Sequence, residues 1–149
     1  MKSLFAVLSF LTLSAFSAPN AEPLFPNGAP GSHGTGPLHE PTLTWYPAPK
    51  ENNTGVTIVV FPGGGYGAVC TSTEGTPIAE WCNTWGASAA VINYRMSAGG
   101  YRHPYPLMDA QRAIRTVRSR AAQYGIDPGK IGVIGFSAGG HLVSTTLTH

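Results

Sequence analysis

Short runs of apolar, β-branched residues alternate along the chain with longer amphipathic segments. Three runs, 56–61, 89–94 and 130–135, are dominated by apolar residues, a pattern typical of strands covered on both faces of a parallel sheet. Residues 42–46 alternate between polar and apolar side chains instead, which favours an edge strand. We therefore expect a sheet built around three buried strands.

The segments between these runs predict helices. Residues 76–85 fit a helix that ends near Gly86, and residues 137–148 fit another. In segment 106–124 the apolar residues recur at steps of three and four, which predicts one amphipathic helix ended by Gly125: Leu107, Ala110, Ile114, Val117 and Ala121. This alternation of strands and helices predicts an α/β fold, with a mostly parallel sheet and helices on both faces.

The first residues have the pattern of an export signal. Lys2 provides the positive start, residues 4–13 the apolar centre, and residues 15–21 the small side chains that a signal peptidase needs. We expect a signal peptide over 1–18, cut between 17 and 21, and a secreted or periplasmic protein. The apolar run is too short and too rich in Ser and Thr to span a membrane.

Residues 19–40 follow as a lead-in dense in proline and glycine, with no hydrophobic period. We expect this segment to be extended and either to lie on the surface or to be partly disordered, with His33 and His39 solvated. The α/β domain is then expected over 41–149.

Composition excludes several classes of protein. Charged residues make up 11% of the chain and the formal net charge is +2, too small to indicate nucleic acid or an anionic membrane as a partner. Four arginines in the 106–124 helix are interpreted as its solvated face: Arg112, Arg115, Arg118 and Arg120. Cys70 and Cys82 either form one disulfide or remain two buried thiols, and without further cysteines or a nearby histidine they make a poor zinc site.

The strongest chemical signal is Gly135-Phe136-Ser137-Ala138-Gly139, directly between a predicted strand and a predicted helix. This G-x-S-x-G pattern is typical of a nucleophile elbow, whose tight turn exposes the serine hydroxyl at the carboxyl end of the sheet. Side chains two residues before and after the serine would clash, which explains the two glycines. The turn also aims the helix N-terminus and the Ala138 amide at developing negative charge.

A second signal is the run Pro62-Gly63-Gly64-Gly65-Tyr66, at the end of the first buried strand. Acyl transfer needs backbone amides that converge on an oxyanion, and glycines let the backbone come that close. Gly63-x-Gly65-x-x-Ala68 also fits a dinucleotide fingerprint, but Pro62 intrudes and no clear helix opens on the glycines. A phosphate-binding P-loop is excluded because no GK[ST] follows, whereas a merely flexible glycine loop stays an alternative.

These motifs together resemble a known family. The glycine run, Asn93-Tyr94-Arg95, the segment 105–113 and the segment 135–141 are similar to the bacterial esterase/lipase group of α/β-hydrolases. Members of this group are often described as acetyl xylan esterase-like or feruloyl-esterase-like. The resemblance covers residues 42–149 and implies an α/β-hydrolase fold, truncated after the nucleophile helix.

By this resemblance Ser137 is the nucleophile, and the amides of Gly64, Gly65 and Ala138 are the oxyanion-hole donors. The acid and the histidine of the family lie downstream of the serine, and no Asp or Glu follows Ser137 here. We expect neither His141, one turn into the last helix, nor the terminal His149 to be the base. Three other candidates receive lesser roles, namely a structural hydrogen bond, a turn and a place along the cleft: Asp109, Asp127 and His103.

The predicted function is a serine carboxylic-ester hydrolase that works through an acyl-enzyme, without metal or organic cofactor. Its substrate would be a small-molecule or polysaccharide ester, plausibly short acetyl esters of carbohydrate. One alternative is a serine peptidase of the prolyl-oligopeptidase kind. Another is an inactive truncated chain; if the chain is instead a fragment, the reading frame past His149 should encode an Asp or Glu and then a His.

Overall fold

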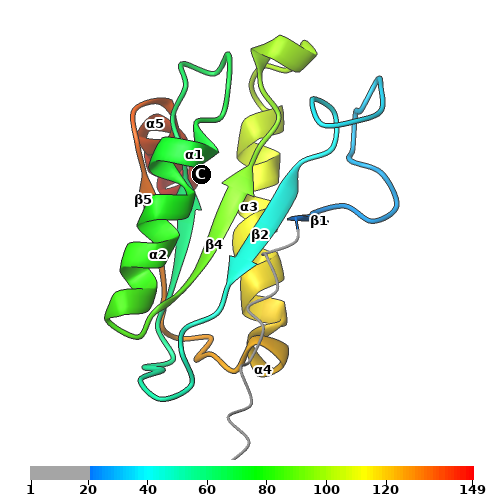
Figure 1. The fold of residues 1–149 in the computed structure, drawn as a ribbon. Coiled ribbons are helices and arrows are strands. Elements are labelled where there is room, and N and C mark those ends of the chain that lie inside the picture. Colours follow the sequence, from blue (N-terminus) through cyan, green and yellow to red (C-terminus); the bar gives the residue numbers. More distant parts are fainter. Residues whose placement is uncertain (1–20) are drawn as a thin grey trace, which may run out of the picture.

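A five-stranded mixed sheet forms the centre of the computed structural model, which describes residues 21–149 (Figure 1). The strand order is β1-β2-β4-β3-β5, with bounds Ala21–Pro23 (β1), Thr42–Tyr46 (β2), Thr57–Phe61 (β3), Ser88–Asn93 (β4) and Ile131–Gly135 (β5). The predicted signal peptide, 1–18, lies outside the described residues.

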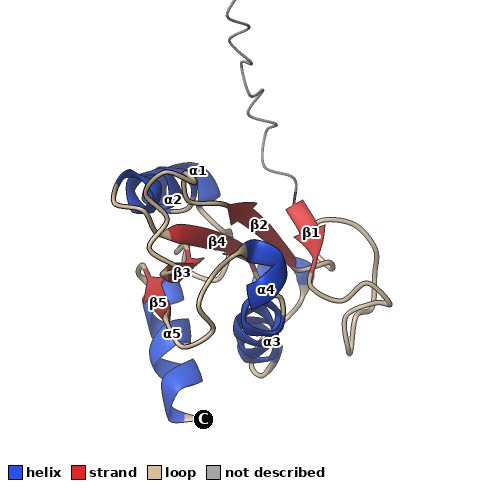
Figure 2. Ribbon diagram, turned by 90° about the horizontal axis from the view of Figure 1, so that it is seen from below, coloured by secondary structure: helices blue, strands red, loops and turns tan. Residues whose placement is uncertain are grey.

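Helices cover both faces of this sheet, as the sequence predicts. Their bounds are Thr71–Glu74 (α1), Thr76–Thr84 (α2), Tyr105–Ser119 (α3), Ala121–Tyr124 (α4) and Ala138–Thr148 (α5), with a 3₁₀ turn over Ser97–Gly99. Figure 2 shows α1 and α2 against one face and α3 and α5 against the other. The core accordingly has two parts, one on each side of the sheet.

The three runs of apolar residues are the parallel part of the sheet. β3 pairs in parallel with β4 and with β5, and its last residue, Phe61, lies opposite Gly135. Because parallel strands end at the same edge of a sheet, the loops that follow β3 and β5 emerge side by side. This register brings the glycine run and the predicted elbow together.

Two expectations about the sheet edges are wrong. β2 matches the predicted bounds, yet it is not an edge strand, because β1 pairs with it on the side away from β4. At the other end of the sheet, all five residues of β5 are only half-buried. β5 is the outermost strand on that side among residues 21–149, so its apolar pattern does not produce full burial.

The predicted single helix over 106–124 is two helices. α3 ends at Ser119, Arg120 has φ −99° and ψ 15°, and α4 then adds one turn. Gly125 ends α4 in the left-handed conformation, with φ 64°, as expected for a C-terminal glycine. The helix is interrupted at Arg120, but Ala121, the first residue of α4, is buried as the apolar pattern predicts. The sequence pattern therefore continues across the interruption.

The proline- and glycine-rich lead-in packs more closely than predicted. Leu24 is only 2% exposed and belongs to the core. The carbonyl of Pro30 accepts a 2.7 Å hydrogen bond from Arg95, a buried side chain at the end of β4. His33 and His39 both contact Tyr101, with the His39 Nδ1 atom 2.6 Å from its hydroxyl. Isolated contacts of this kind leave no hydrophobic period in a sequence.

Candidate active site

The predicted elbow forms a sharp turn between β5 and α5. Ser137 has φ 47° and ψ −116°, a sparsely populated conformation for a residue with a side chain, and it is exposed at the carboxyl end of the sheet. The carbonyl of Ser137 accepts a 3.0 Å hydrogen bond from the His141 amide, which fixes the first turn of α5.

Close contacts around the turn explain its two glycines. A Cβ on Gly135 would lie 2.7 Å from the Gly140 nitrogen, and one on Gly139 would lie 2.7 Å from the Pro62 carbonyl oxygen. Both distances are shorter than real Cβ contacts. The steric argument made from the sequence therefore agrees with the structure, and Gly139 in addition brings α5 against the end of β3.

The glycine run packs directly against this turn. A Cβ on Gly63 would lie 2.7 Å from the Phe136 carbonyl oxygen and 3.0 Å from the Ser137 Cβ atom. The next three residues all have positive φ, 130° at Gly64, 62° at Gly65 and 60° at Tyr66. The loop thus reverses direction beside the serine, and no helix begins on the glycines, which argues against the dinucleotide interpretation.

Three backbone amides at this place donate no hydrogen bond within residues 21–149: those of Gly64, Gly65 and Ala138. The carbonyl that shares each of their peptide planes does have a partner. Gly63 accepts from the Cys70 amide at 2.9 Å, Gly64 from the Gly67 and Ala68 amides at 3.0 and 3.1 Å, and Ser137 from His141. Because the peptide unit is planar, each carbonyl bond also orients the free amide on the other side of its plane.

No acid–base partner for Ser137 is found among the described residues, in which its hydroxyl makes no side-chain hydrogen bond. The His141 ring instead lies 2.8 Å from the Tyr66 hydroxyl, through Nδ1. His149 is at the far end of the 11-residue α5, about 16 Å along the helix axis. Neither histidine is in position to take the serine proton.

Comparison with known proteins decides the family. The family model described as BD-FAE matches residues 44–148 of the chain. The chain belongs to the BD-FAE family. Its fold is that of the α/β-hydrolases, as the resemblance implies.

Several esterases are similar to this BD-FAE chain. The acetylxylan esterase of Xylanibacter ruminicola is 40% identical over 98 residues, which are 66% of this chain and 20% of the relative. The carboxylesterase NlhH of Mycobacterium tuberculosis is 35% identical over 106 residues, 68% of this chain and 31% of the relative. The chain therefore spans between a fifth and a third of the length of these two relatives.

Solved structures agree with the fold. An acetyl ester-xyloside bifunctional hydrolase from Caldicellulosiruptor lactoaceticus superposes with a TM-score of 0.73 at 42% identity, over 85% of this chain and 45% of the other. An esterase from Thermogutta terrifontis gives a TM-score of 0.70 at 28% identity, over 86% and 44% of the two chains.

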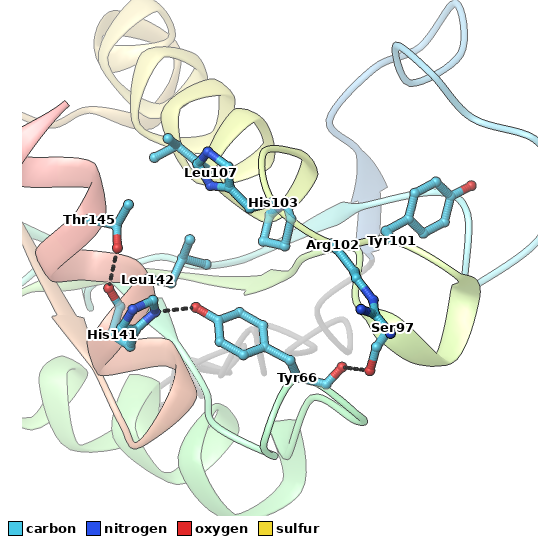
Figure 3. Close-up of a pocket in the computed structure, with 10 residues that line it drawn as sticks. Tyr66, Ser97, Tyr101, Arg102, His103, Leu107, His141, Leu142 and Thr145 are labelled. Carbon is cyan, nitrogen blue, oxygen red and sulfur yellow. Dashed lines mark hydrogen bonds between the residues drawn. The ribbon is translucent and has the colours of Figure 1, made fainter.

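A cavity of about 220 Å³ opens beside the glycine run of the BD-FAE chain (Figure 3). Leu107 and Leu142 contribute apolar surface from α3 and α5, while Tyr66 and His141 line it next to the elbow. His103 also lines this cavity, in agreement with the place along the cleft expected for it.

Asp109 and Asp127 have structural surroundings, as predicted. Asp109 is fully buried and accepts bonds from the Arg95 guanidinium at 2.8–3.2 Å and from the Arg95 amide at 2.9 Å. Burial raises the pKa of the Asp109 carboxyl, and the hydrogen bonds from Arg95 oppose this shift. Asp127 accepts from the Gly129 amide at 2.8 Å in the turn before β5.

Both cysteines are free thiols, so the disulfide alternative is not realised. Cys82 is buried in α2, and burial raises the pKa of its thiol. Residues 21–149 hold no cluster of three or more His, Cys, Asp or Glu side chains that could bind a metal ion. Within the same range, none of the helices is long and apolar enough to cross a bilayer.

Two side chains at the site were not singled out as functional from the sequence. The Tyr94 hydroxyl donates a 2.7 Å bond to the Pro62 carbonyl, and the Glu74 carboxylate accepts a 2.7 Å bond from the Gly63 amide. Burial raises the pKa of Tyr94, and the nearby Tyr66, Cys70 and Glu74 add to the shift. Tyr94 belongs to a quoted motif, whereas nothing in the local pattern distinguishes Glu74 from a solvated helix residue.

Proposed function

We propose that this chain carries the nucleophile and the oxyanion hole of a carboxylic-ester hydrolase that works through an acyl-enzyme. One observation carries the proposal: an exposed serine in a strained turn lies beside a loop, and three amides of this turn and loop have no acceptor among the described residues. Preorganised amides of this kind stabilise negative charge that develops on an acyl oxygen.

The chemistry follows from the arrangement. The Ser137 Oγ atom attacks the acyl carbon while its proton passes to a general base, and the carbonyl oxygen becomes an oxyanion bound by the amides of Gly64, Gly65 and Ala138. Collapse of this intermediate breaks the ester bond, and the departing alkoxide takes the proton from the base. Water then attacks the acyl-enzyme by the same route and releases the carboxylic acid.

The substrate is proposed to be a short acyl ester of a carbohydrate. Support comes from the relatives whose names include acetylxylan esterase and acetyl ester-xyloside hydrolase. The cavity lined by Tyr66 and His141 adds to it, because its volume of about 220 Å³ suits a small group. The signal-peptide pattern over 1–18 supports export to the compartment where polysaccharide esters are found.

The acid and the base are proposed to come from polypeptide other than residues 21–149. Within that range the His141 ring contacts the Tyr66 hydroxyl, and the buried Asp109 is bound by Arg95. The relatives extend well beyond the part that this chain matches, which leaves them room for such residues.

The experiment measures nitrophenol release from p-nitrophenyl acetate by the protein expressed from its complete reading frame. Ser137→Ala should lower kcat to the background, a loss on the order of 10⁶-fold. Ser144→Ala is the matched control, because Ser144 lies on the exposed face of the same helix and its hydroxyl bonds only to the His141 carbonyl. Unchanged turnover by Ser137→Ala would overturn the assignment of the nucleophile.

A second measurement separates the substrate classes. Acetate release from acetylated xylan should far exceed cleavage of a dipeptidyl amide. Preferential cleavage of the amide would favour a serine peptidase of the prolyl-oligopeptidase kind instead.

A further inference from the structure

A single carboxylate lies against the glycine loop on the side of the sheet covered by α1. Glu74 is the last residue of α1, and its Oε2 atom accepts a 2.7 Å hydrogen bond from the Gly63 amide. The point at which a Cβ on Gly63 would lie is 2.9 Å from this oxygen and 3.0 Å from the Ser137 Cβ atom. The carboxylate and the proposed nucleophile are therefore neighbours across one glycine.

The peptide group between Pro62 and Gly63 is held on both sides. On one side its N–H, the Gly63 amide, donates to Glu74. The same plane contains the Pro62 carbonyl, which accepts from the hydroxyl of Tyr94, a side chain only 1% exposed. Two opposed bonds to a planar unit prevent its rotation about the chain direction. One further peptide plane separates it from the positive-φ conformations of Gly64 and Gly65.

The next plane is tied to the same short helix. The Gly63 carbonyl accepts from the Cys70 amide at 2.9 Å, and the Cys70 carbonyl accepts from the Glu74 amide at 2.9 Å. The turn from Cys70 to Glu74 thus binds both polar groups of Gly63. The Cys70 amide donates to the Gly63 carbonyl, and the Glu74 carboxylate accepts from the Gly63 amide. Because the second plane carries the Gly64 amide, movement at Gly63 would re-aim one of the proposed oxyanion donors.

We propose that Glu74 is a positioning residue of the oxyanion hole, which acts as a hydrogen-bond acceptor for Gly63 and so aims the Gly64 amide. The inference rests on the proposed function. The negative charge itself is not the useful property, since a charge this close to the serine would oppose the forming oxyanion. What the site requires of this side chain is its reach and its acceptor oxygen. Glu74 bonds to the Gly63 amide and makes no hydrogen bond with the Ser137 hydroxyl, so the role proposed for it is positioning.

Two substitutions of Glu74 test separately whether the loop needs the length or the charge of this side chain. Glu74→Gln keeps both the length and an acceptor oxygen but removes the charge, whereas Glu74→Asp keeps the charge but is one methylene too short. The assay uses p-nitrophenyl acetate and the protein expressed from its complete reading frame, with Glu74→Ala as a third variant that removes the carboxylate. Glu74→Gln should keep kcat within about threefold of the parent, whereas Glu74→Asp and Glu74→Ala should lower kcat about tenfold to a hundredfold. KM should change by less than about twofold in all three variants, because the loss arises in the transition state.

Glu80→Ala is the matched control, since Glu80 is an exposed glutamate on the neighbouring α2 and makes no hydrogen bond with the loop. It should have parental kcat and KM. Thermal unfolding shows whether each variant folds, and the comparison of the conservative variants Gln and Asp decides even where Glu74→Ala does not fold. Parental kcat in Glu74→Asp, or a loss in Glu74→Gln equal to that of Asp, would overturn the proposal. Failure of Ser137→Ala to abolish turnover would instead overturn the proposed function.

Discussion

Two turns meet at the carboxyl edge of the sheet, and they are held in different ways. The elbow after β5 is held by backbone packing: Gly135 and Gly139 leave no room for a side chain, and the carbonyl of Ser137 is bonded to its own helix. The glycine loop after β3 has backbone bonds of its own, but it is also held by side chains from other elements. Tyr94 comes from the end of β4, Glu74 from α1, and Ser97 from the 3₁₀ turn.

The difference has a physical basis. A strand-to-helix turn is short, so its geometry is determined by sterics within a few residues, and two glycines are sufficient. A loop that must leave amides unpaired cannot be stabilised through those amides. Its remaining polar groups carry the bonds instead, and some of them, the Pro62 carbonyl and the Gly63 amide, have partners in other elements. The elbow should therefore be sensitive to added volume, and the loop to lost hydrogen bonds.

Adding one methyl group to each turn tests this contrast with the largest expected effect. In Gly139→Ala the new Cβ would collide with the backbone of Phe61 and Pro62, neither of which can move without distorting β3. We expect a loss of more than about 3 kcal/mol in the free energy of unfolding, or no folded protein.

In Gly65→Ala nothing lies within 4 Å of the new Cβ, and only the positive φ of 62° is strained. The expected loss is about 1 kcal/mol. Urea unfolding followed by circular dichroism measures both variants. Equal losses would show that packing does not distinguish the two turns.

The same contrast explains how much of the site could be predicted from the sequence. The elbow is local, so G-x-S-x-G between a strand and a helix was sufficient to predict its sterics, and the parallel register placed the glycine run beside it. The bonds that hold the loop join residues 11 and 32 positions apart, Gly63 with Glu74 and Pro62 with Tyr94. No periodicity in one sequence reveals such a pair.

The errors about the fold have the same origin. β1 is three residues long and pairs with a strand twenty residues later, so the lead-in was interpreted as surface chain and β2 as an edge. The break between α3 and α4 at Arg120 does not interrupt the apolar pattern, so the sequence pattern does not predict it either. By contrast, β2, the parallel strands and α2 depend on patterns within one element, and their bounds were predicted to within a residue or two.

Removing one hydroxyl from the loop is a smaller perturbation than the clash at Gly139. Tyr94→Phe keeps the buried ring but leaves the Pro62 carbonyl without its 2.7 Å partner. We expect a loss of about 1–3 kcal/mol in the free energy of unfolding, together with a reduced kcat for p-nitrophenyl acetate. Tyr46→Phe is the control, because it loses a hydroxyl contact of 3.0 Å with Thr76 that involves no residue of the glycine run. If both variants keep the parental kcat, the Tyr94 hydroxyl does not hold the loop for catalysis.

The smallest expected effect is a dependence on alkaline pH. Burial raises the pKa of Tyr94 above its ordinary value of 10.0, so the folded protein keeps this phenol protonated where the unfolded chain releases the proton. The stability that Tyr94 contributes is therefore complete below pH 10 and is lost as the pH rises above it, by at most about 1.4 kcal/mol per pH unit. Urea unfolding at pH 9 and pH 11 should show the advantage of the parent over Tyr94→Phe shrinking by about 1 kcal/mol. Because the other tyrosines are common to both proteins, an advantage that stays constant would mean that the Tyr94 phenol titrates alike in the folded and unfolded states.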